Sequence, residues 1–531
     1  MFNPLEIQTR EEHMKILLIS FENDIRALCA LSSLLQNQGY EVKIIQGDPT
    51  SVSTLPNLLK GNQVSQFLEN IYTMSECLRA FSDGYMKPDW SYLKDFEEKY
   101  CHRKNLLQLV MTDPIIFNFH HYRRPYYTKL PFKEAGFAIA ELLLKWLENI
   151  FADYQPEVLF TIGNNYFVKN AACFMAAQKK CQIIQLVPGR MGTYWFPHSD
   201  AVFAYEDHRY QDFLEQEIPQ SDLREANKHI SEFLSSKEGL YEASAVTSRN
   251  KTQLFTITSI VKKLFFLYKR QLQNLLRKGK ITYRKDMNTI SYFWKGDYIA
   301  SNKFKIMIYH FRIAINQIKY LKDKNSPFTK DIPTEDYLLF PLHTLPESST
   351  LTLSKEYYEA DLIRFISKEM PAGMLLLVKE NPNMIGERFW SFYQEIDKLP
   401  NVVLLDPIVS TQKTIKMSKG VVGISGTALL EAIFRGKPIH CFGNPEFLPI
   451  VNSYGFESFA SFAKGCLNSS LVANQELALK HIQYVLNYGV EIDSKELKKG
   501  NKGLNFQSQV NKIFNLIQKE TGERNPIIKA K

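Results

Sequence analysis

Three stretches in the second half of the chain combine residue types that bind phosphate or move protons. The first follows an apolar run at 337–341 and contains His343 and Glu347, with hydroxyl side chains at 348–350. Histidine and glutamate are the side chains most readily tuned for proton transfer near neutral pH. This loop therefore predicts two catalytic candidates, Glu347 and His343. The alternative is that the hydroxyls only cap a helix and that His343 is an ordinary loop residue.

The second stretch follows an apolar run at 374–379. Lys379 ends the run, Asn381 and Pro382 come next, and Arg388 lies near the start of the following expected helix. Two cations that flank one loop suit a phosphate group. The alternative is a surface turn with ordinary charges.

The third stretch, Ser425-Gly426-Thr427, follows an apolar run at 420–424 and enters an expected helix. Free backbone N–H groups at a helix N-terminus form a ready anion site, and Gly426 allows close approach of a ligand. Glu431, one turn inside the helix, is placed to accept hydrogen bonds from ribose hydroxyls. A purely structural helix cap is the alternative. Three such loops after strands of one domain together predict a nucleotide-phosphate site there.

Alternating strand and helix patterns predict an α/β fold with two doubly wound, Rossmann-like domains, in which ligands bind at the carboxyl ends of strands. Strands are expected at residues 15–20, 41–45, 157–162, 182–187 and 201–205, and again at 337–341, 374–379, 402–405, 420–424 and 438–441. Of the 531 residues, we assign 1–215 to the first domain, 216–330 to a helical connector, 331–470 to the second domain and 471–531 to C-terminal helices and a polar tail.

The connector carries most of the positive charge. Residues 249–285 hold eleven Lys and Arg and no Asp or Glu, in a chain whose net charge is +9. Apolar residues recur there at helical spacing, and a basic amphipathic helix lies well on an anionic membrane surface. A solvated connector with a basic face is the alternative. We expect no nucleic-acid partner, because no recognised nucleic-acid motif accompanies the charge.

Several classes of site have no support in the sequence. The chain has neither a zinc-protease or Walker motif nor a dinucleotide fingerprint after its first strand, so we expect no metal and no cofactor. Its seven cysteines include no C-x-x-C pair, and no apolar run reaches the ~20 residues of a membrane span. We therefore expect a cytoplasmic protein, peripheral at the inner face of the membrane.

The motifs at 340–350, 378–388, 400–402 and 425–438 together resemble the capsular polysaccharide biosynthesis family, which includes Kdo transferases. The Ser-Gly-Thr helix entry with Glu431-Ala432 also resembles lipid-A disaccharide synthase and nucleotide-sugar 2-epimerases, which share the GT-B architecture. The resemblance covers about residues 337–445. It extends to the first domain only through its α/β pattern, Gly163-Asn164 and Arg190, which it places on the acceptor side.

The resemblance implies a metal-independent glycosyltransferase of surface polysaccharide assembly, with a nucleotide-sugar donor such as CMP-Kdo and a glycan or glycolipid acceptor. The family's usual Lys-Glu-His-Pro is here Lys379-Glu380-Asn381-Pro382. Asparagine donates a hydrogen bond but carries no charge, so the donor is expected to differ from CMP-Kdo or to bind more weakly. A nucleotide-sugar 2-epimerase and a catalytically silent nucleotide-binding component of the assembly machinery are the alternatives.

Overall fold

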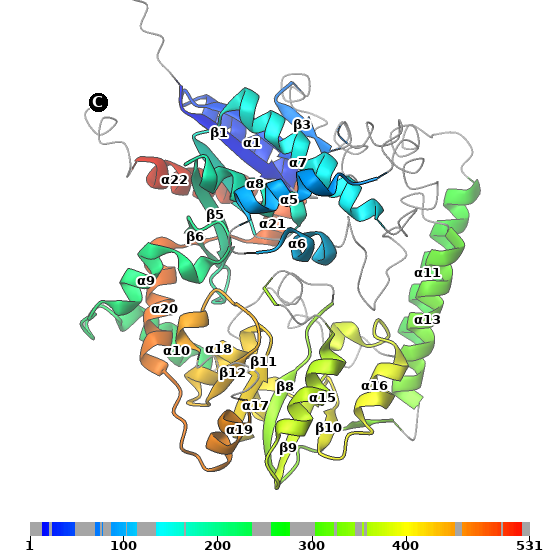
Figure 1. Cartoon of the computed structure of the whole chain (residues 1–531). Helices are drawn as coiled ribbons and strands as arrows, with labels where there is room; N and C mark the ends of the chain where they lie inside the picture. Colours follow the sequence, from blue (N-terminus) through cyan, green and yellow to red (C-terminus); the bar gives the residue numbers. More distant parts are fainter. Residues whose placement is uncertain are drawn as a thin grey trace, which may run out of the picture.

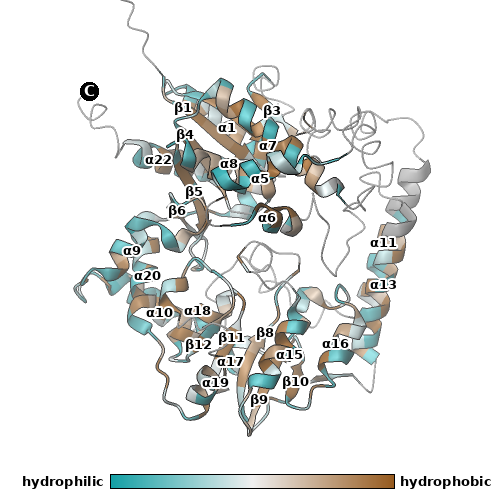
Figure 2. Ribbon diagram, in the orientation of Figure 1, coloured by the Kyte–Doolittle hydropathy of each residue, from teal (hydrophilic) through white to brown (hydrophobic). Residues whose placement is uncertain are grey.

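The computed structural model describes most of the chain: residues 13–20, 24–47, 69–74, 77, 87–101, 104–113, 134–163, 166–235, 256–276, 303–322, 326–345, 353–354, 358–451, 459–500 and 503–522. Two α/β domains lie one above the other in Figure 1, each built on its own mostly parallel sheet. The apolar colour of both sheets in Figure 2 marks the two cores. The predicted α/β class with two Rossmann-like domains is therefore confirmed.

The first sheet has the strand order β13-β6-β5-β4-β1-β2-β3. Strands β1 to β5 pair in parallel. β6 is antiparallel to its neighbours β5 and β13, so β13, at the edge of the sheet, runs in the direction of β1 to β5. The bounds are β1 (Lys15–Ser20), β2 (Glu41–Gln46), β3 (Ile71–Thr73), β4 (Val158–Ile162), β5 (Gln182–Pro188), β6 (Tyr194–His198) and β13 (Val490–Glu491). The strands expected at 15–20 and 41–45 are confirmed as β1 and β2, which pair in parallel. The strand expected at 201–205 is wrong, because a short 3-10 helix, η2 (Ala204–Glu206), forms there.

Helices cover both faces of this sheet. One face packs against α5 (Trp90–Tyr100), α6 (Leu106–Thr112), α7 (Ala135–Tyr154) and α8 (Phe167–Gln178). The other packs against α1 (Ile25–Gln36) and, from the far end of the chain, α21 (Ser494–Lys499) and α22 (Phe506–Gly522). Strands buried on both faces read as continuous apolar runs, as in KILLIS at β1.

The second sheet is parallel throughout, with the order β12-β11-β8-β9-β10-β7. Its strands are β7 (Phe328–Thr329), β8 (Asp336–Pro341), β9 (Met374–Lys379), β10 (Val402–Leu405), β11 (Gly420–Gly423) and β12 (Ile439–Cys441). Its helices are α15 (Glu359–Glu369), η3 (Pro382–Met384), α16 (Trp390–Ile396), α17 (Thr411–Met417), α18 (Thr427–Phe434), η4 (Leu448–Ile450) and α19 (Phe459–Leu467). The strands β8, β9 and β11 bring the three polar loops to one edge of this sheet.

A long helix, α20 (Gln475–Tyr488), joins the domains. It packs against α18 of the second domain and against β6, α9 (His208–Glu215) and α10 (Arg224–Ser235), which follow the first sheet. The buried ring of Phe196 and that of Tyr484 on α20 belong to the same apolar core as Leu339 of β8. We propose to keep the boundaries near 215 and 470 and to move the start of the second domain back to include β7.

The connector contributes two long helices, α11 (Ile257–Leu276) and α13 (Lys303–Lys322), which pack side by side at the right of Figure 1. α13 is fixed to the second domain. Its Asn316 Nδ2 donates to the carbonyl oxygens of Gly386 and Arg388, and its Tyr320 hydroxyl donates to Asp406.

Candidate functional site

The site lies where β8, β9 and β11 end. These strands are neighbours in the second sheet, in the order β11-β8-β9. Because parallel strands share the direction of their carboxyl ends, the loops that follow them meet at one edge. The backbone N–H of Leu342, just after β8, donates to the carbonyl of Lys379 at the end of β9, which ties two of the loops together.

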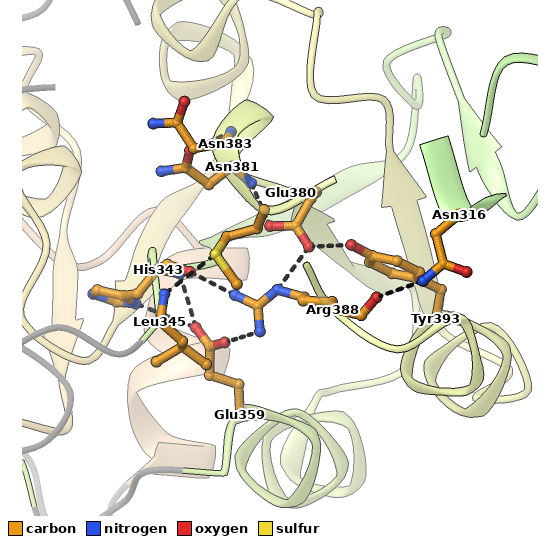
Figure 3. Close-up of polar contacts among 10 residues, drawn as sticks. Asn316, His343, Leu345, Glu359, Glu380, Asn381, Asn383, Arg388 and Tyr393 are labelled. Atoms are coloured by element: carbon orange, nitrogen blue, oxygen red, sulfur yellow. Dashed lines mark hydrogen bonds and ion pairs between the residues drawn. The ribbon is translucent and has the colours of Figure 1, made fainter. Parts of the chain in front are cut away.

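Arg388 occupies the centre of this edge, with no surface exposed (Figure 3). Its Nη1 lies 2.5 Å from Glu359 Oε2, its Nε lies 2.7 Å from Glu380 Oε2, and its Nη2 donates to the carbonyl of His343. Tyr393 donates its hydroxyl hydrogen to the same Glu380 oxygen at 2.7 Å. Each guanidinium nitrogen therefore has a protein partner.

The two carboxylates around Arg388 differ electrostatically. Burial by itself would raise the pKa of Glu359, but the Arg388 guanidinium and the contacts from His343 hold that pKa below its usual value. Burial raises the pKa of Glu380, and the nearby Glu359 charge adds to this against the pull of Arg388. Glu359 is therefore the carboxylate that keeps its negative charge beside His343.

Glu359 contacts the backbone N–H and one of the two ring nitrogens of His343. Glu359 Oε1 accepts a hydrogen bond from the His343 backbone N–H at 2.8 Å and lies 3.4 Å from its Nδ1. With Glu359 ionised, the Nδ1 proton points to that carboxylate. The other ring nitrogen, Nε2, is buried and has no hydrogen-bond partner within the part of the chain that the structure describes. A buried polar atom without a partner is costly, so Nε2 marks a place where a ligand atom would be stabilised.

The unpartnered nitrogen lies against the start of α18. A Cβ on Gly426 would come within 3.2 Å of His343 Nε2, so a larger residue at this position would crowd the imidazole. Gly426 is also the N-cap residue of α18 and, as a glycine, makes no side-chain cap hydrogen bond. Backbone N–H groups at a helix N-terminus attract anions.

The rest of the Ser-Gly-Thr turn lies beside these groups. Ser425 is fully buried, and Thr427, the first residue of α18, is half-buried. Glu431 is buried one turn further along and accepts a hydrogen bond from Gln412 Nε2 of α17 at 2.8 Å. The oxygen of the Gln412 amide in turn accepts from the Arg435 guanidinium. A polar network thus joins α17 to α18 next to the turn.

The remaining donor-site candidates are placed by the loop after β9. Lys379 is buried and donates from Nζ to the carbonyl of Pro407 at 3.0 Å. Asn381 is partly exposed; its Oδ1 accepts from the backbone of Asn383, and Pro382 follows as the first residue of η3. The two cations expected to bind phosphate, Lys379 and Arg388, are therefore both turned into the protein, where Arg388 has no surface for a ligand to touch.

The acceptor-side candidates lie at the carboxyl ends of the first sheet. Gly163 adopts a left-handed φ of 72° after β4, and its N–H donates to the carbonyl of Leu186. Arg190, after β5, makes two hydrogen bonds to Glu446 beyond β12, Nε to Oε2 at 3.1 Å and Nη2 to Oε1 at 3.0 Å. This pair joins the ends of the two sheets. Asn164 and Glu347 lie outside the described residues.

Three residues that contact the predicted site residues were not predicted from the sequence: Glu359, Glu446 and Gln412. Glu359 begins a helix, where acidic residues are common, and nothing in its neighbourhood points to Arg388. Glu446 and Gln412 likewise contact segments far from them in sequence.

Within the described ranges, no group of three or more His, Cys, Asp or Glu side chains is placed to hold a metal ion. In the same part of the chain, no helix is both long and apolar enough to span a membrane.

Comparisons with known proteins place the chain among distant neighbours. No protein-family profile matches it, and no curated protein matches it. Among solved structures, the chain is similar to the KpsC β-Kdo 2,7-transferase of Thermosulfurimonas dismutans, at 10% identity over 70% of this chain and 89% of that one, with a TM-score of 0.34. It is also similar to the UDP-GlcNAc 2-epimerase of Neisseria meningitidis bound to UDP-GlcNAc, at 13% identity over 96% and 100% of the two chains, with a TM-score of 0.24. A third neighbour is the spinosyn rhamnosyltransferase SpnG complexed with thymidine diphosphate, at 10% identity over 89% and 96%, with a TM-score of 0.25.

Proposed function

We propose that the protein is a metal-independent glycosyltransferase of surface polysaccharide assembly, and that the phosphate of its nucleotide-sugar donor binds between His343 and the N-terminus of α18. One observation carries the proposal: the buried Nε2 of His343, which has no partner among the described residues, lies against the N-terminus of α18 at Gly426. A phosphate oxygen at this point would accept hydrogen bonds from backbone N–H groups and, when both ring nitrogens of His343 carry a proton, from Nε2.

The transfer reaction needs both kinds of hydrogen-bond donor, the imidazole and the backbone N–H groups of α18. As the bond between the anomeric carbon and the donor phosphate breaks, the phosphate takes the electron pair and becomes more negative. A cationic or hydrogen-bonding group held in a water-poor position stabilises that charge without reorganisation. The acceptor hydroxyl forms the new bond to the anomeric carbon, and its proton passes to a base. We propose Glu347 as that base and His343 as the partner of the leaving phosphate.

The ion-pair cluster then has a positioning role. Arg388 holds Glu359 in its ionised form, and Glu359 fixes the imidazole so that Nε2 faces α18. We therefore propose that Arg388, Glu359 and Glu380 position His343 and that Arg388 does not touch the donor. Thr427 and Asn381, which retain exposed surface, are proposed as direct donor contacts, with Glu431 near the ribose.

The proposed acceptor is a glycan or glycolipid that approaches from the first domain, on the side of Gly163, Asn164 and Arg190. The bidentate contact of Arg190 with Glu446 supports this placement, because it brings the carboxyl end of β5 next to the second domain. Asn381 replaces the histidine of the family pattern, so the donor nucleotide has to be found by experiment.

A nucleotide screen tests the proposal. CMP, CDP, UDP and GDP are each added to the wild-type protein, and the nucleotide that binds raises the melting temperature. His343→Phe keeps a ring but removes Nε2, so affinity for that nucleotide should fall by at least about tenfold. His229→Phe, on α10 away from the site, is the matched control and should bind normally.

Turnover distinguishes the reactions. The matching nucleotide sugar should be consumed only when a polysaccharide or glycolipid acceptor is present. Conversion of UDP-GlcNAc to its 2-epimer without acceptor would contradict the proposal and identify an epimerase. Nucleotide binding that His343→Phe leaves unchanged would place the phosphate elsewhere.

A further inference from the structure

The outer side of the α11–α13 hairpin carries large apolar side chains that the protein does not cover. On α11, Phe265 and Phe266 are 62% and 64% exposed, with their ring centroids 6.0 Å apart. On α13, Ile308 is 67% exposed, and Phe311 and Ile315 are exposed as well. Figure 2 shows apolar and polar residues alternating along both helices. An exposed apolar surface of this kind marks a contact with a partner.

Most of the exposed side chains of α13 lie on one side of the helix. Ile308, Phe311, Ile315 and Lys319 recur at spacings of three and four residues, which places them in one stripe. The opposite side, with Tyr309, Ile313 and Asn316, is buried on the second domain. The helix is therefore held in place by one side while it presents the other outward.

The charge of the hairpin has a single sign. α11 contains four Lys or Arg and α13 contains five, and neither helix contains an Asp or Glu. Lys262, Lys263 and Lys269 are exposed on α11, next to the two phenylalanines. On α13, Lys319 and Lys322 line a hollow of about 330 Å³ together with Ile315 and Ile318. Apolar side chains thus stand among lysines.

We propose that this hairpin docks the protein on an anionic lipid bilayer. The lysines would pair with lipid phosphates, and the phenylalanines and isoleucines would enter the boundary between headgroups and acyl chains. A protein or a second copy of this chain would have to supply acidic residues against the exposed lysines. A lipid surface supplies the negative charge and the apolar layer at once. At ~1.5 Å per residue each helix is ~30 Å long, so both would lie along the surface.

The inference does not depend on the reaction. It concerns a surface formed by residues of α11 and α13, whereas the proposed phosphate site is formed by residues at the ends of β8 and β11. Variants of the hairpin should therefore leave nucleotide binding unchanged. A protein that docks on lipid and binds no nucleotide would refute the proposed function and keep this inference.

Vesicle flotation with the full chain tests the proposal. The wild type should float with vesicles that contain phosphatidylglycerol and should not float with phosphatidylcholine alone. The triple variant Phe265→Ser/Phe266→Ser/Phe311→Ser and the triple variant Lys262→Glu/Lys319→Glu/Lys322→Glu should each bind at least about tenfold more weakly. A Phe265→Trp protein should also lose fluorescence on brominated acyl chains, which shows that the side chain reaches them.

Matched variants elsewhere control for loss of charge or of apolar surface. Val472→Ser/Leu504→Ser removes exposed apolar side chains outside the hairpin, and Lys94→Glu/Lys398→Glu/Lys464→Glu reverses exposed lysines outside it. Both should float like the wild type. Two results would overturn the proposal. In the first, neither hairpin variant floats less than the wild type. In the second, the wild type does not bind lipid and forms a dimer, and the phenylalanine variant is a monomer.

Discussion

Glu359 Oε2 lies 2.5 Å from Arg388 Nη1, in an ion pair in which neither side chain has any exposed surface. The same glutamate contacts the backbone and the Nδ1 atom of His343 through its other oxygen. One carboxylate thus links a fully buried cation to the only ring of the site whose second nitrogen has no partner among the described residues. The stability of the cluster and the function of the site should therefore be coupled.

Arg388→Met should destabilise the protein by about 3–5 kcal/mol, because it leaves two buried carboxylates without their cation. The loss should depend on pH. In the wild type, Arg388 keeps the pKa of Glu359 low, so the stability from Glu359 is present above its usual pKa and is lost as pH falls through the lowered value. Without Arg388, both carboxyls bind protons more tightly when folded, so the variant gains relative to the wild type as pH falls.

Urea unfolding at several values between about pH 8 and pH 5 measures this difference. The gap in unfolding free energy between wild type and Arg388→Met should narrow toward the acid side. Arg364→Met is the matched control, because Arg364 is 42% exposed and pairs with Asp361 at the surface. Its effect should stay below about 1 kcal/mol at every pH. A gap that does not change with pH would show that the carboxylates are stabilised by other groups.

The double variant Ser425→Ala/Thr427→Val should reduce nucleotide affinity by at least about tenfold, since hydrogen bonds to a charged group are worth ~1.5–3 kcal/mol each. Isothermal titration with the nucleotide found in the screen gives the affinity, and the melting temperature reports the fold. Ser410→Ala removes a true helix cap, the one that accepts from Lys413 at the start of α17, and should leave affinity unchanged. Equal affinities in all three proteins would show that the turn has no part in binding.

Glu347→Gln should reduce turnover by at least about 10²-fold while nucleotide affinity stays within a few-fold, because the amide keeps the shape of the side chain but cannot accept the acceptor proton. Steady-state rates and titration on one preparation compare the two. Glu335→Gln, at an exposed position before β8, is the control. Near-normal turnover of a folded Glu347→Gln protein would show that Glu347 is not the base, and His343 would then be the candidate.

His481 should make the packing of α20 sensitive to acid. Its Nδ1 accepts from the Tyr210 hydroxyl at 2.8 Å, and its Nε2 donates to the carbonyl of Gly189 at 3.3 Å, so the neutral ring satisfies both partners. Burial lowers the pKa of His481 to about 4. Because the unfolded chain binds this proton more readily, folding stability is lost as pH falls from about 6.5 toward 4.

His481→Gln keeps an acceptor and a donor but does not titrate, so its unfolding free energy should fall less steeply over that pH range. Some pH dependence should persist, since burial also lowers the pKa of His198 and of His440 to about 4. The control is His13→Gln, at an exposed position near the N-terminal edge of the first sheet. Identical slopes for wild type and His481→Gln would mean that α20 is not the acid-sensitive element.

Local sequence patterns predicted the second domain well. Apolar runs between turn residues predicted β9 and β10 with both ends correct, and the Ser-Gly-Thr turn predicted the helix that follows it, α18. The pattern failed at 201–205, where an apolar run of strand-like composition forms a 3-10 helix. It also missed β6, because Pro197 within Tyr194–His198 argues against a strand. This strand lies between β5 and β13 near the edge of the sheet, a position set by tertiary contacts.

The meeting of the three loops at one edge of the second sheet was predicted from the sequence, but the contacts of their side chains were not. The three loops could be found because they follow strands and carry polar side chains. The orientation of those side chains could not be predicted. Arg388 points inward because it pairs with Glu359 and Glu380, which come from two other segments. An ion pair across 29 positions leaves no periodic signal. The contact between Arg190 and Glu446 spans 256 positions, and no local sequence pattern predicts it.

The return of the chain end to the first sheet sets an order for folding during synthesis. β13 pairs with β6, and α22 packs against α1, so parts of the first domain wait for residues 490–522. The second sheet, by contrast, is built entirely from residues 328–441 and leaves the ribosome earlier than that last segment. The domain whose synthesis begins first is therefore completed last. Until then, apolar side chains of α1 such as Leu28 and Leu35 lack part of their cover, and a chaperone would have a defined surface to protect.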